Sequence, residues 1–320
     1  MSPELFLADL EAKPETLRSL DVGDAWGFVR SPAEVLLLGM GSSHYANLVA
    51  AARLRAGGVP AVAELASSDL LPRVSAETLV VAVSASAGSV ETLDAVDRIG
   101  APFVALANRP GPLTERASRT VWMEAGEERG GVACRSFQHT LALLLALESR
   151  LTAGPPPPVG LAADATADLL SRAAHWRPRL AELLLGPSGT HVVAPARRLS
   201  SALQSALMLR EGPRLPAVGC ETGDWSHVDV YLTKTTDYRM LLLAGSRWEP
   251  QLLDWTGRRG STVVAVGADV AGATETLRFR HDEVDDVRLL TETLVGELVA
   301  AHAWIEGTAA VSRRRPGTSH

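Results

Sequence analysis

Cysteine and lysine are both scarce in this chain of 320 residues, and each scarcity excludes a kind of site. The two cysteines, Cys134 and Cys220, are too few for a disulfide framework or a cysteine-rich metal centre. The two lysines, Lys13 and Lys234, leave arginine as the main cation. No group of histidine, aspartate and glutamate has the spacing of metal ligands. We therefore expect neither a metal nor a cofactor.

Long apolar runs and blocks of one charge are also missing. No run approaches the roughly 20 apolar residues that cross a bilayer, and the acidic start MSPELFLADLEAKPETL lacks the pattern of a signal peptide. The net charge is −6, and no block of lysine or arginine could follow a polyanion. We expect a cytoplasmic protein that binds neither a membrane nor nucleic acid. The negative net charge does not exclude a small phosphorylated ligand, because a few backbone amides and hydroxyls can hold one phosphate.

Short apolar runs alternate with helix-length segments in both halves of the chain. Strands of this kind, separated by helices, predict parallel sheets that are covered on both faces. The predicted strands span 35–39, 59–65, 78–84, 102–107 and 119–124 in the first half, and 191–194, 215–220, 240–244, 262–267 and 277–281 in the second.

The proline run Pro155–Pro158 separates the two halves, because consecutive prolines cannot continue a helix. We expect two tandem domains, residues 1–154 and 159–320, each a parallel five-stranded α/β/α sandwich of the flavodoxin or Rossmann type. The second domain is predicted to end in a long helix over 289–305, followed by an irregular tail after Gly307.

Two loops of the first half are rich in small hydroxyl residues, and both run from a strand into a helix. Gly41-Ser42-Ser43 follows the first predicted strand, and Ser84-Ala85-Ser86-Ala87-Gly88-Ser89 begins where the third ends. Ligands of open parallel sheets bind beyond the carboxyl ends of strands. Glycine lets the backbone approach an anion, while hydroxyls and first-turn amides donate hydrogen bonds to it.

These serines could instead be plain helix N-caps. However, four hydroxyl residues with a glycine, Ser84, Ser86, Ser89 and Thr92 around Gly88, exceed what capping requires, so we interpret the second loop as a phosphate-binding site. Neither a Walker motif nor a dinucleotide-binding glycine motif is present.

The motifs resemble those of the SIS (sugar isomerase) domain family, in particular the isomerase half of glucosamine-6-phosphate synthase and related phosphosugar isomerases and deglycases. The family's Gly-Thr-Ser resembles residues 41–43, and its Ser-x-Ser-Gly-x-Thr phosphate loop resembles residues 84–89, with Ala87 and Gly88 as departures. Its Ala-Gly-x-Glu-x-Gly resembles Ala125–Gly130. The resemblance, which covers nearly the whole chain, implies two tandem SIS domains and phosphosugar contacts at Gly41, Ser42, Ser43, Ser84, Ala85, Ser86, Ser89 and Ala133.

Aldose–ketose isomerisation requires a base that moves a proton between two carbons and a group that helps to open the ring. A carboxylate and an imidazole suit these tasks. Glu211 ends the predicted helix ALQSALMLRE, and His227 follows 16 residues later. In the SIS family, the same spacing separates the catalytic glutamate from a histidine that reaches the site of the neighbouring subunit. The resemblance therefore implies a base at Glu211, ring opening by His227, and a homodimer with shared sites. His44 is a weaker candidate for a ligand contact, and His139 is expected in the core.

Four departures from the family pattern leave the activity open. Met208 replaces a lysine one turn before Glu211, and the family's lysine near the C-terminus has no counterpart, although Arg313, Arg314 or Arg315 could supply a cation. The loop Ala194-Pro195-Ala196 cannot cradle an anion, so we expect one site per chain. Too few residues for a glutamine amidotransferase domain stand before the first predicted strand, so we do not expect glutamine-dependent amination by this chain alone.

Two hypotheses follow. The first is an enzyme, either an aldose–ketose isomerase or a deaminase or deglycase, that acts on a hexose phosphate or amino-sugar phosphate. The second is a non-catalytic sugar-phosphate sensor or regulatory protein, which the missing lysines and Ala133 favour and the Glu211–His227 pair opposes.

Overall fold

The computed structural model describes the backbone of residues 1–314 and the side chains of residues 1–308. The chain forms two compact units. The N-terminal unit comprises Pro14–Glu127 and Ala133–Ala163, and the C-terminal unit comprises Met1–Lys13, Glu128–Val132 and the chain from Asp164 onward. Residues 154–158 have no regular secondary structure, and the boundaries placed there by the proline run stay a prediction.

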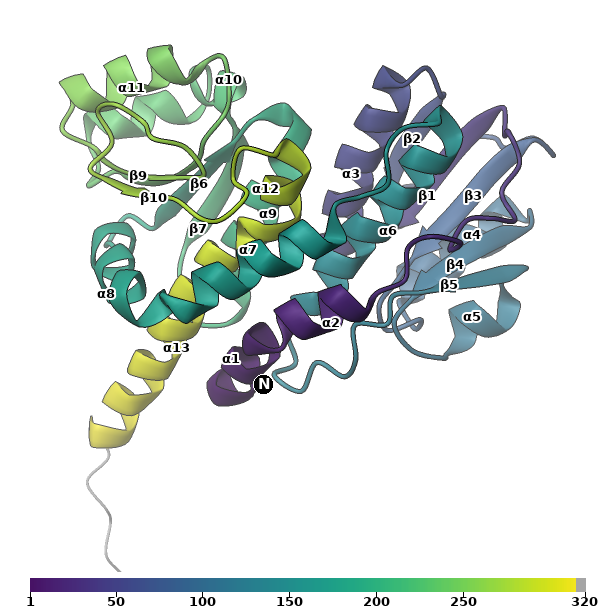
Figure 1. Cartoon of the computed structure of the whole chain (residues 1–320), viewed down its shortest axis with the longest axis horizontal. Coiled ribbons are helices and arrows are strands. Elements are labelled where there is room, and N and C mark those ends of the chain that lie inside the picture. Colours follow the sequence, from purple (N-terminus) through teal and green to yellow (C-terminus); the bar gives the residue numbers. More distant parts are fainter. Residues whose placement is uncertain (315–320) are drawn as a thin grey trace, which may run out of the picture. The chain divides into compact units, whose positions relative to one another are not determined.

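The N-terminal unit is built on a five-stranded parallel sheet of order β2-β1-β3-β4-β5. Helices α3 (Gly41–Ala56) and α6 (Arg135–Thr152) pack together on one face, and α4 (Val90–Ile99) and α5 (Pro112–Arg116) lie on the other (Figure 1). Burial on both faces explains why the central strands are continuous apolar runs. The strands are β1 Glu34–Gly39, β2 Ala61–Leu65, β3 Thr78–Val83, β4 Phe103–Ala107 and β5 Arg119–Trp122.

The C-terminal unit repeats this plan with a parallel sheet of order β10-β9-β8-β6-β7. Helices α8 (Ala173–Leu184), α9 (Leu199–Glu211) and α13 (Thr293–Arg314) form one covering layer. Helices α10 (Thr222–Trp225) and α11 (Glu249–Arg258) pack together with the 3-10 helix η2 (Asp229–Lys234). The strands are β6 Thr190–Ala194, β7 Ala217–Glu221, β8 Arg239–Leu243, β9 Thr262–Val266 and β10 Glu275–Leu277.

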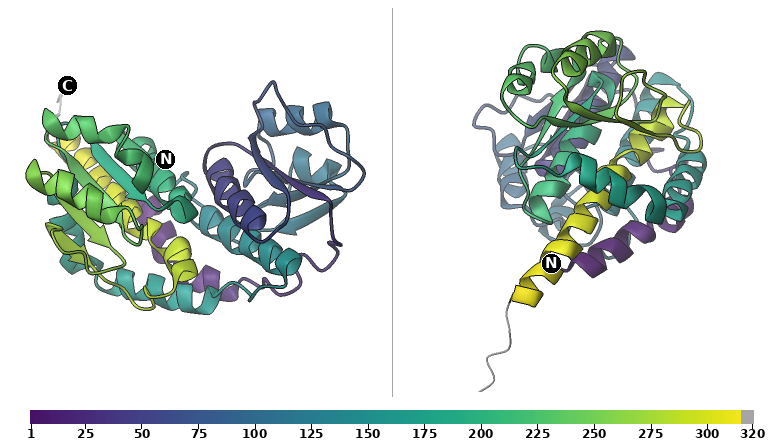
Figure 2. Two further views of the ribbon diagram at one scale, coloured as in Figure 1. Left: turned by 90° about the horizontal axis from the view of Figure 1, so that it is seen from above. Right: turned by 90° about the vertical axis from the view of Figure 1, so that its left-hand side faces the viewer.

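Figure 2 shows in two further views that helices flank each sheet. The remaining helices are α1 (Pro3–Glu11), α2 (Lys13–Ser19), α7 (Val159–Ser171), η1 (Ala196–Arg198) and α12 (Asp285–Thr291). The predicted fold class, two parallel five-stranded α/β/α layers, is confirmed. Within residues 1–314, no helix is both long and apolar enough to span a bilayer.

The end of the chain departs from expectation. Helix α13 continues through residue 314, so the prediction of an irregular tail after Gly307 is wrong over 308–314. The alanines at 309 and 310 are strong helix formers, and together they outweigh the cost of one glycine. Of the arginines considered as substitute cations, Arg313 and Arg314 have undescribed side chains, and Arg315 lies outside the described residues.

Two glycines permit close packing around α9. A Cβ atom on Gly219 of β7 would lie 2.9 Å from the backbone of Ala202, and one on Gly296 of α13 would lie 2.6 Å from the Cβ of Ser205. Because neither glycine adds a side chain at these contacts, β7 and α13 both approach α9 closely and fix its position. This helix ends at Glu211.

Candidate functional site

The two hydroxyl-rich loops leave the N-terminal sheet at neighbouring positions. Strands β1 and β3 are paired in parallel, with Gly39 opposite Val83 at their carboxyl ends. The chain passes from β1 to β2 on one side and from β3 to β4 on the other, so the sheet order reverses direction here. Such a reversal is where open α/β sheets bind ligands. The loops 41–43 and 84–89 therefore leave the sheet from the ends of two paired strands, and their role as a phosphate site stays a prediction.

The loop after β3 is a tight turn that gathers serine hydroxyls. Ser84 is buried, and its Oγ lies 3.4 Å from Oγ of Ser86. The amide of Ala87 donates to the carbonyl of Ser84 (3.0 Å), and the amide of Gly88 donates to Oγ of Ser86 (3.3 Å). The two hydroxyls can therefore donate to the same small anion.

Ala87 has φ of +52°, in the left-handed region that favours glycine. This is the position at which the resemblance predicts glycine, and the alanine keeps the conformation at a cost of about 1–2 kcal/mol. Gly111 packs against it, since a Cβ there would lie 3.1 Å from both the Cβ and the carbonyl oxygen of Ala87. The departure in sequence therefore leaves the turn intact.

The helices that follow the two loops differ in how their first turns are capped. Helix α3 has Met40 at its N-cap, which makes no side-chain hydrogen bond to the first turn. Helix α4 is capped by Ser89, whose Oγ accepts from the amide of Thr92 (3.3 Å) and donates to Glu91 (2.9 Å). This contact and the helix amides lower the pKa of Glu91. Ser89 is thus an N-cap as well as a candidate phosphate contact.

A cation that the sequence reasoning missed lies at the loop. Arg109 is exposed, and its Nε donates to the carbonyl of Ser86 (3.4 Å). The preceding Asn108 accepts from the amide of Ala125 (2.9 Å) and donates to the carbonyl of Gly126 (2.7 Å). Both residues directly follow β4, which lies next to β3 in the sheet. Their position after a predicted strand could have identified them from the sequence as candidates for the site. The site is therefore not made of hydroxyls and amides alone.

Other predicted residues of the N-terminal unit have structural surroundings. His44 is half-buried, and burial lowers its pKa, opposed by Glu64. Ala133 is partly exposed just before α6, and its methyl side chain offers no hydrogen bond. Arg135 is buried and donates to the carbonyl of Glu127. His139 is fully buried with Nδ1 2.6 Å from the carbonyl of Met123, which confirms its assignment to the core.

Glu211 is the last residue of α9 in the C-terminal unit and is half-buried. Burial raises the pKa of Glu211; the charge of Arg210 opposes the rise and that of Glu128 adds to it. A carboxyl group with a raised pKa exchanges protons closer to neutral pH, as a catalytic base must. Glu128 is the glutamate of the motif at 125–130, and its effect on Glu211 could not be predicted from the sequence, because only the fold brings the two carboxyl groups near each other.

His227 is exposed on the loop that follows α10. A group of buried aromatic side chains packs beneath this loop. Nε1 of Trp225 donates to the Tyr238 hydroxyl (2.8 Å), and His191 stacks on the Tyr238 ring with 4.2 Å between the ring centroids. Within the described part of the chain, no hydrogen bond or ion pair joins His227 to Glu211. The loop also exposes large apolar side chains, namely Val228, Tyr231 and Leu232, and Trp248 is exposed at the start of α11.

The corresponding edge of the C-terminal sheet is filled by the protein itself. The Glu249 carboxylate accepts from the amides of Gly245 and Ser246 after β8. Arg197, which follows β6, donates to the carbonyl of Gly245 (2.9 Å) and to Asp285 (2.8 Å). The amides of Gly245 and Ser246 are thus occupied by the protein's own carboxylate, and one site per chain stays a prediction.

Comparisons with known proteins show what this two-domain α/β fold is similar to. No family profile matches the chain. The chain is 28% identical over 258 residues to the glutamine–fructose-6-phosphate aminotransferase of Aeropyrum pernix, which covers 72% of this chain and 42% of the relative. Across the curated relatives, the chain spans between 36% and 44% of their length.

Solved structures share the whole fold. The C-terminal domain of the glucosamine-fructose-6-phosphate aminotransferase from Francisella tularensis superposes with a TM-score of 0.79 at 15% identity, covering 95% of this chain and 96% of that one. The glucosamine-6-phosphate deaminase of Thermotoga maritima gives 0.72 at 16% identity, with 94% of each chain covered. These findings confirm the resemblance to the SIS family that the motifs indicated.

Proposed function

We propose that the chain is an enzyme that binds a hexose phosphate or amino-sugar phosphate at residues 41–43 and 84–89. The observation that carries the proposal is the turn after β3, where Oγ of Ser84 and Oγ of Ser86 lie 3.4 Å apart beside the end of β1. Arg109 supplies positive charge next to these hydroxyls. Ser43 and Ser89 complete the phosphate contacts. The names of the relatives, an isomerising aminotransferase and a deaminase, support a sugar phosphate as the substrate.

Glu211 acts as the base in this proposal. Its carboxylate takes the proton from C2 of the open-chain sugar and returns it to C1, so an aldose and a ketose interconvert without any other reactant. If the substrate carries an amine at C2, the same proton transfer gives an imine, which water hydrolyses with loss of ammonia. The raised pKa of Glu211 favours both steps because the group must accept and release a proton in each cycle.

His227 assists ring opening, and we propose that it does so in the site of a second copy of this chain. Two observations support a shared site. The imidazole is exposed and has no contact with Glu211 of its own chain. The loop that carries it also exposes Val228 and Tyr231, each more than half accessible, as a homodimer interface would require.

Deuterium exchange at C2 of glucose-6-phosphate and glucosamine-6-phosphate, two aldose phosphates with a hydrogen on C2, tests the enzyme directly. We expect exchange with the native chain. The rate of exchange should fall at least about a hundredfold in Glu211→Gln, because general-base catalysis usually contributes that much. The phosphosugar should still raise the melting temperature of this variant. Full exchange in Glu211→Gln would refute the assignment of the base. Glu182→Gln, an exposed glutamate of α8, is the matched control and should exchange normally.

A sugar-phosphate sensor is the second candidate function. The observation that favours it is that neither lysine supplies the missing cation, because Lys13 is buried in an ion pair with Glu297 and Lys234 lies over the ring of Tyr231. Binding of both sugar phosphates without any C2 exchange would support the sensor over the enzyme.

A further inference from the structure

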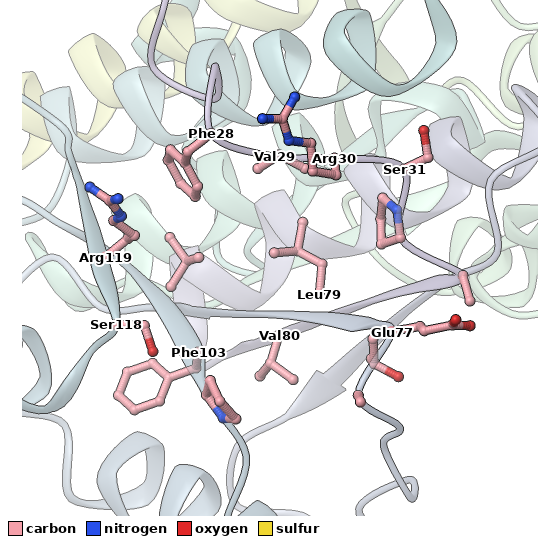
Figure 3. A pocket seen from close by; sticks show the side chains of 16 residues that line it. Phe28, Val29, Arg30, Ser31, Glu77, Leu79, Val80, Phe103, Ser118 and Arg119 are labelled. Carbon is pink, nitrogen blue, oxygen red and sulfur yellow. The ribbon is translucent and has the colours of Figure 1, made fainter.

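A cavity of about 620 Å³ opens at the amino edge of the N-terminal sheet, where β3, β4 and β5 begin (Figure 3). Its size falls within the range of small-molecule sites. The hydroxyl-rich loops lie at the opposite, carboxyl edge, about 20 Å away along the six residues of β3. This cavity is therefore separate from the proposed phosphosugar site, and no role assigned above uses it.

The lining is apolar on both faces of the sheet edge. Leu79 of β3 points toward the segment of Phe28, whereas Val80 of β3 and Phe103 of β4 point to the other face (Figure 3). Phe28 closes one side on the face of Leu79, and it is 37% exposed although a large apolar side chain is normally covered. A flat apolar group could rest on this ring and bury the remaining apolar surface.

The segment that forms the upper wall is fixed from several directions. The indole Nε1 of Trp26 donates to the carbonyl of Leu143 in α6 (2.7 Å), and Arg150 donates to the carbonyl of Val29 (3.1 Å). The amide of Ala33 donates to the carbonyl of Glu77 (3.0 Å). Because the wall is held before any ligand arrives, binding requires little additional ordering.

Two arginines place positive charge at the aromatic end. The guanidinium of Arg119 lies 5.8 Å from the centroid of the Phe28 ring, whereas Figure 3 shows the Arg30 side chain extending from the same wall away from Leu79. Both side chains are exposed, and neither forms an ion pair with another described residue. The acidic residue of the lining, Glu77, lies toward the other end in this view.

We propose that this cavity binds a small organic anion with a flat apolar body. The body rests on Phe28 and Leu79, and its anionic group, a carboxylate, sulfonate or phosphate, lies at Arg119, with Arg30 adding positive charge at the same end of the cavity. The combination of an apolar lining and two unpaired guanidinium groups selects an amphipathic anion over both a neutral hydrophobic molecule and a bare ion.

Anilinonaphthalene sulfonate is a suitable probe, and N-phenylnaphthylamine is its neutral counterpart. Titrated into the full chain, the sulfonate should bind saturably at one site per chain and quench the emission of Trp26, whose ring lies 6.1 Å from that of Phe28. The double variant Arg30→Gln/Arg119→Gln should weaken this binding about tenfold, since two exposed charge contacts are removed. Arg73→Gln, an exposed arginine outside the cavity, should bind as the native chain does.

Three results would overturn the proposal. The neutral counterpart could bind as tightly as the sulfonate, or the double variant could retain native affinity at an unchanged melting temperature. Fructose-6-phosphate could also displace the probe, which would show that the probe binds at the serine loops and not in this cavity. The variant Ser84→Ala/Ser86→Ala separates this inference from the proposed function. It removes hydroxyls of the proposed phosphosugar site only, so the probe should bind to it with native affinity.

Discussion

At the residue scale, the most consequential finding is that Lys13 is fully buried against Glu297 of α13. Burial raises the pKa of Glu297, and the charge of Lys13 opposes the rise. A buried ion pair contributes little net stability, but the loss of one partner leaves an uncompensated charge in an apolar interior. One of the two lysines of the chain is thus part of the core of the C-terminal unit.

Lys13→Met should therefore destabilise the protein by about 3–5 kcal/mol. The double variant Lys13→Met/Glu297→Leu should recover most of that loss, since it removes both charges and keeps the volume. Urea unfolding of the native chain and the two variants measures the difference. Equal stability of the two variants would mean that the pair is not buried in solution.

Glu292 gives a second prediction at this scale. Burial raises the pKa of Glu292 to about 7, although Nε of Arg198 lies 3.4 Å from its carboxylate. The folded state thus keeps a proton that the unfolded glutamate releases near its ordinary pKa of 4.5. The contribution of this group to stability is present below pH 4.5 and is lost as the pH rises to 7, by about 3 kcal/mol.

The difference in unfolding free energy between the native chain and Glu292→Gln, measured from pH 4.5 to pH 7.5, isolates this effect. The native chain should lose stability relative to the variant as the pH rises. A constant difference across this interval would contradict the raised pKa.

At the scale of elements, the position of Glu211 depends on how α9 packs between β7 and α13. Gly296 lets α13 approach Ser205 so closely that a side chain there would overlap the Cβ of Ser205. The approach is set by tertiary contact, because α9 and α13 are far apart in the sequence.

Gly296→Val should destabilise the protein by roughly 2–3 kcal/mol, because overpacking forces the two helices apart. In the protein that remains folded, C2 exchange should fall while phosphosugar affinity stays close to native, since the serine loops belong to the other unit. Gly257→Val in α11 is the control, because a Cβ there meets no atom within 4 Å. If both variants lose the same stability, helix propensity and not packing is the cause.

At the scale of the whole molecule, a shared site makes a prediction about mixtures of chains. Glu211→Gln and His227→Ala should each be inactive alone. In a mixed dimer, one site combines the intact Glu211 of one chain with the intact His227 of the other. Random mixing of equal amounts should therefore restore about a quarter of the native rate of exchange per chain. No recovery in a mixture shown to contain mixed dimers would contradict the shared site.

Local chemistry determined much of this protein. Alternating apolar runs and helix-length segments specify two layered parallel sheets, because strand and helix periodicities are properties of neighbouring residues. The loops at 41–43 and 84–89 were found in the same way, since serine and glycine after a strand have a local meaning. His139 could be assigned to the core from the apolar helix around it.

Other features were decided only by the tertiary structure. Arg109 at the loop carbonyl, Glu128 near Glu211 and Lys13 against Glu297 all pair residues whose separation along the chain carries no periodic signal. The cavity beside Phe28 is formed in the same way, by segments that meet only when the sheet closes. Sequence periodicity fixes which elements form, whereas charge proximity and burial exist only after those elements have packed.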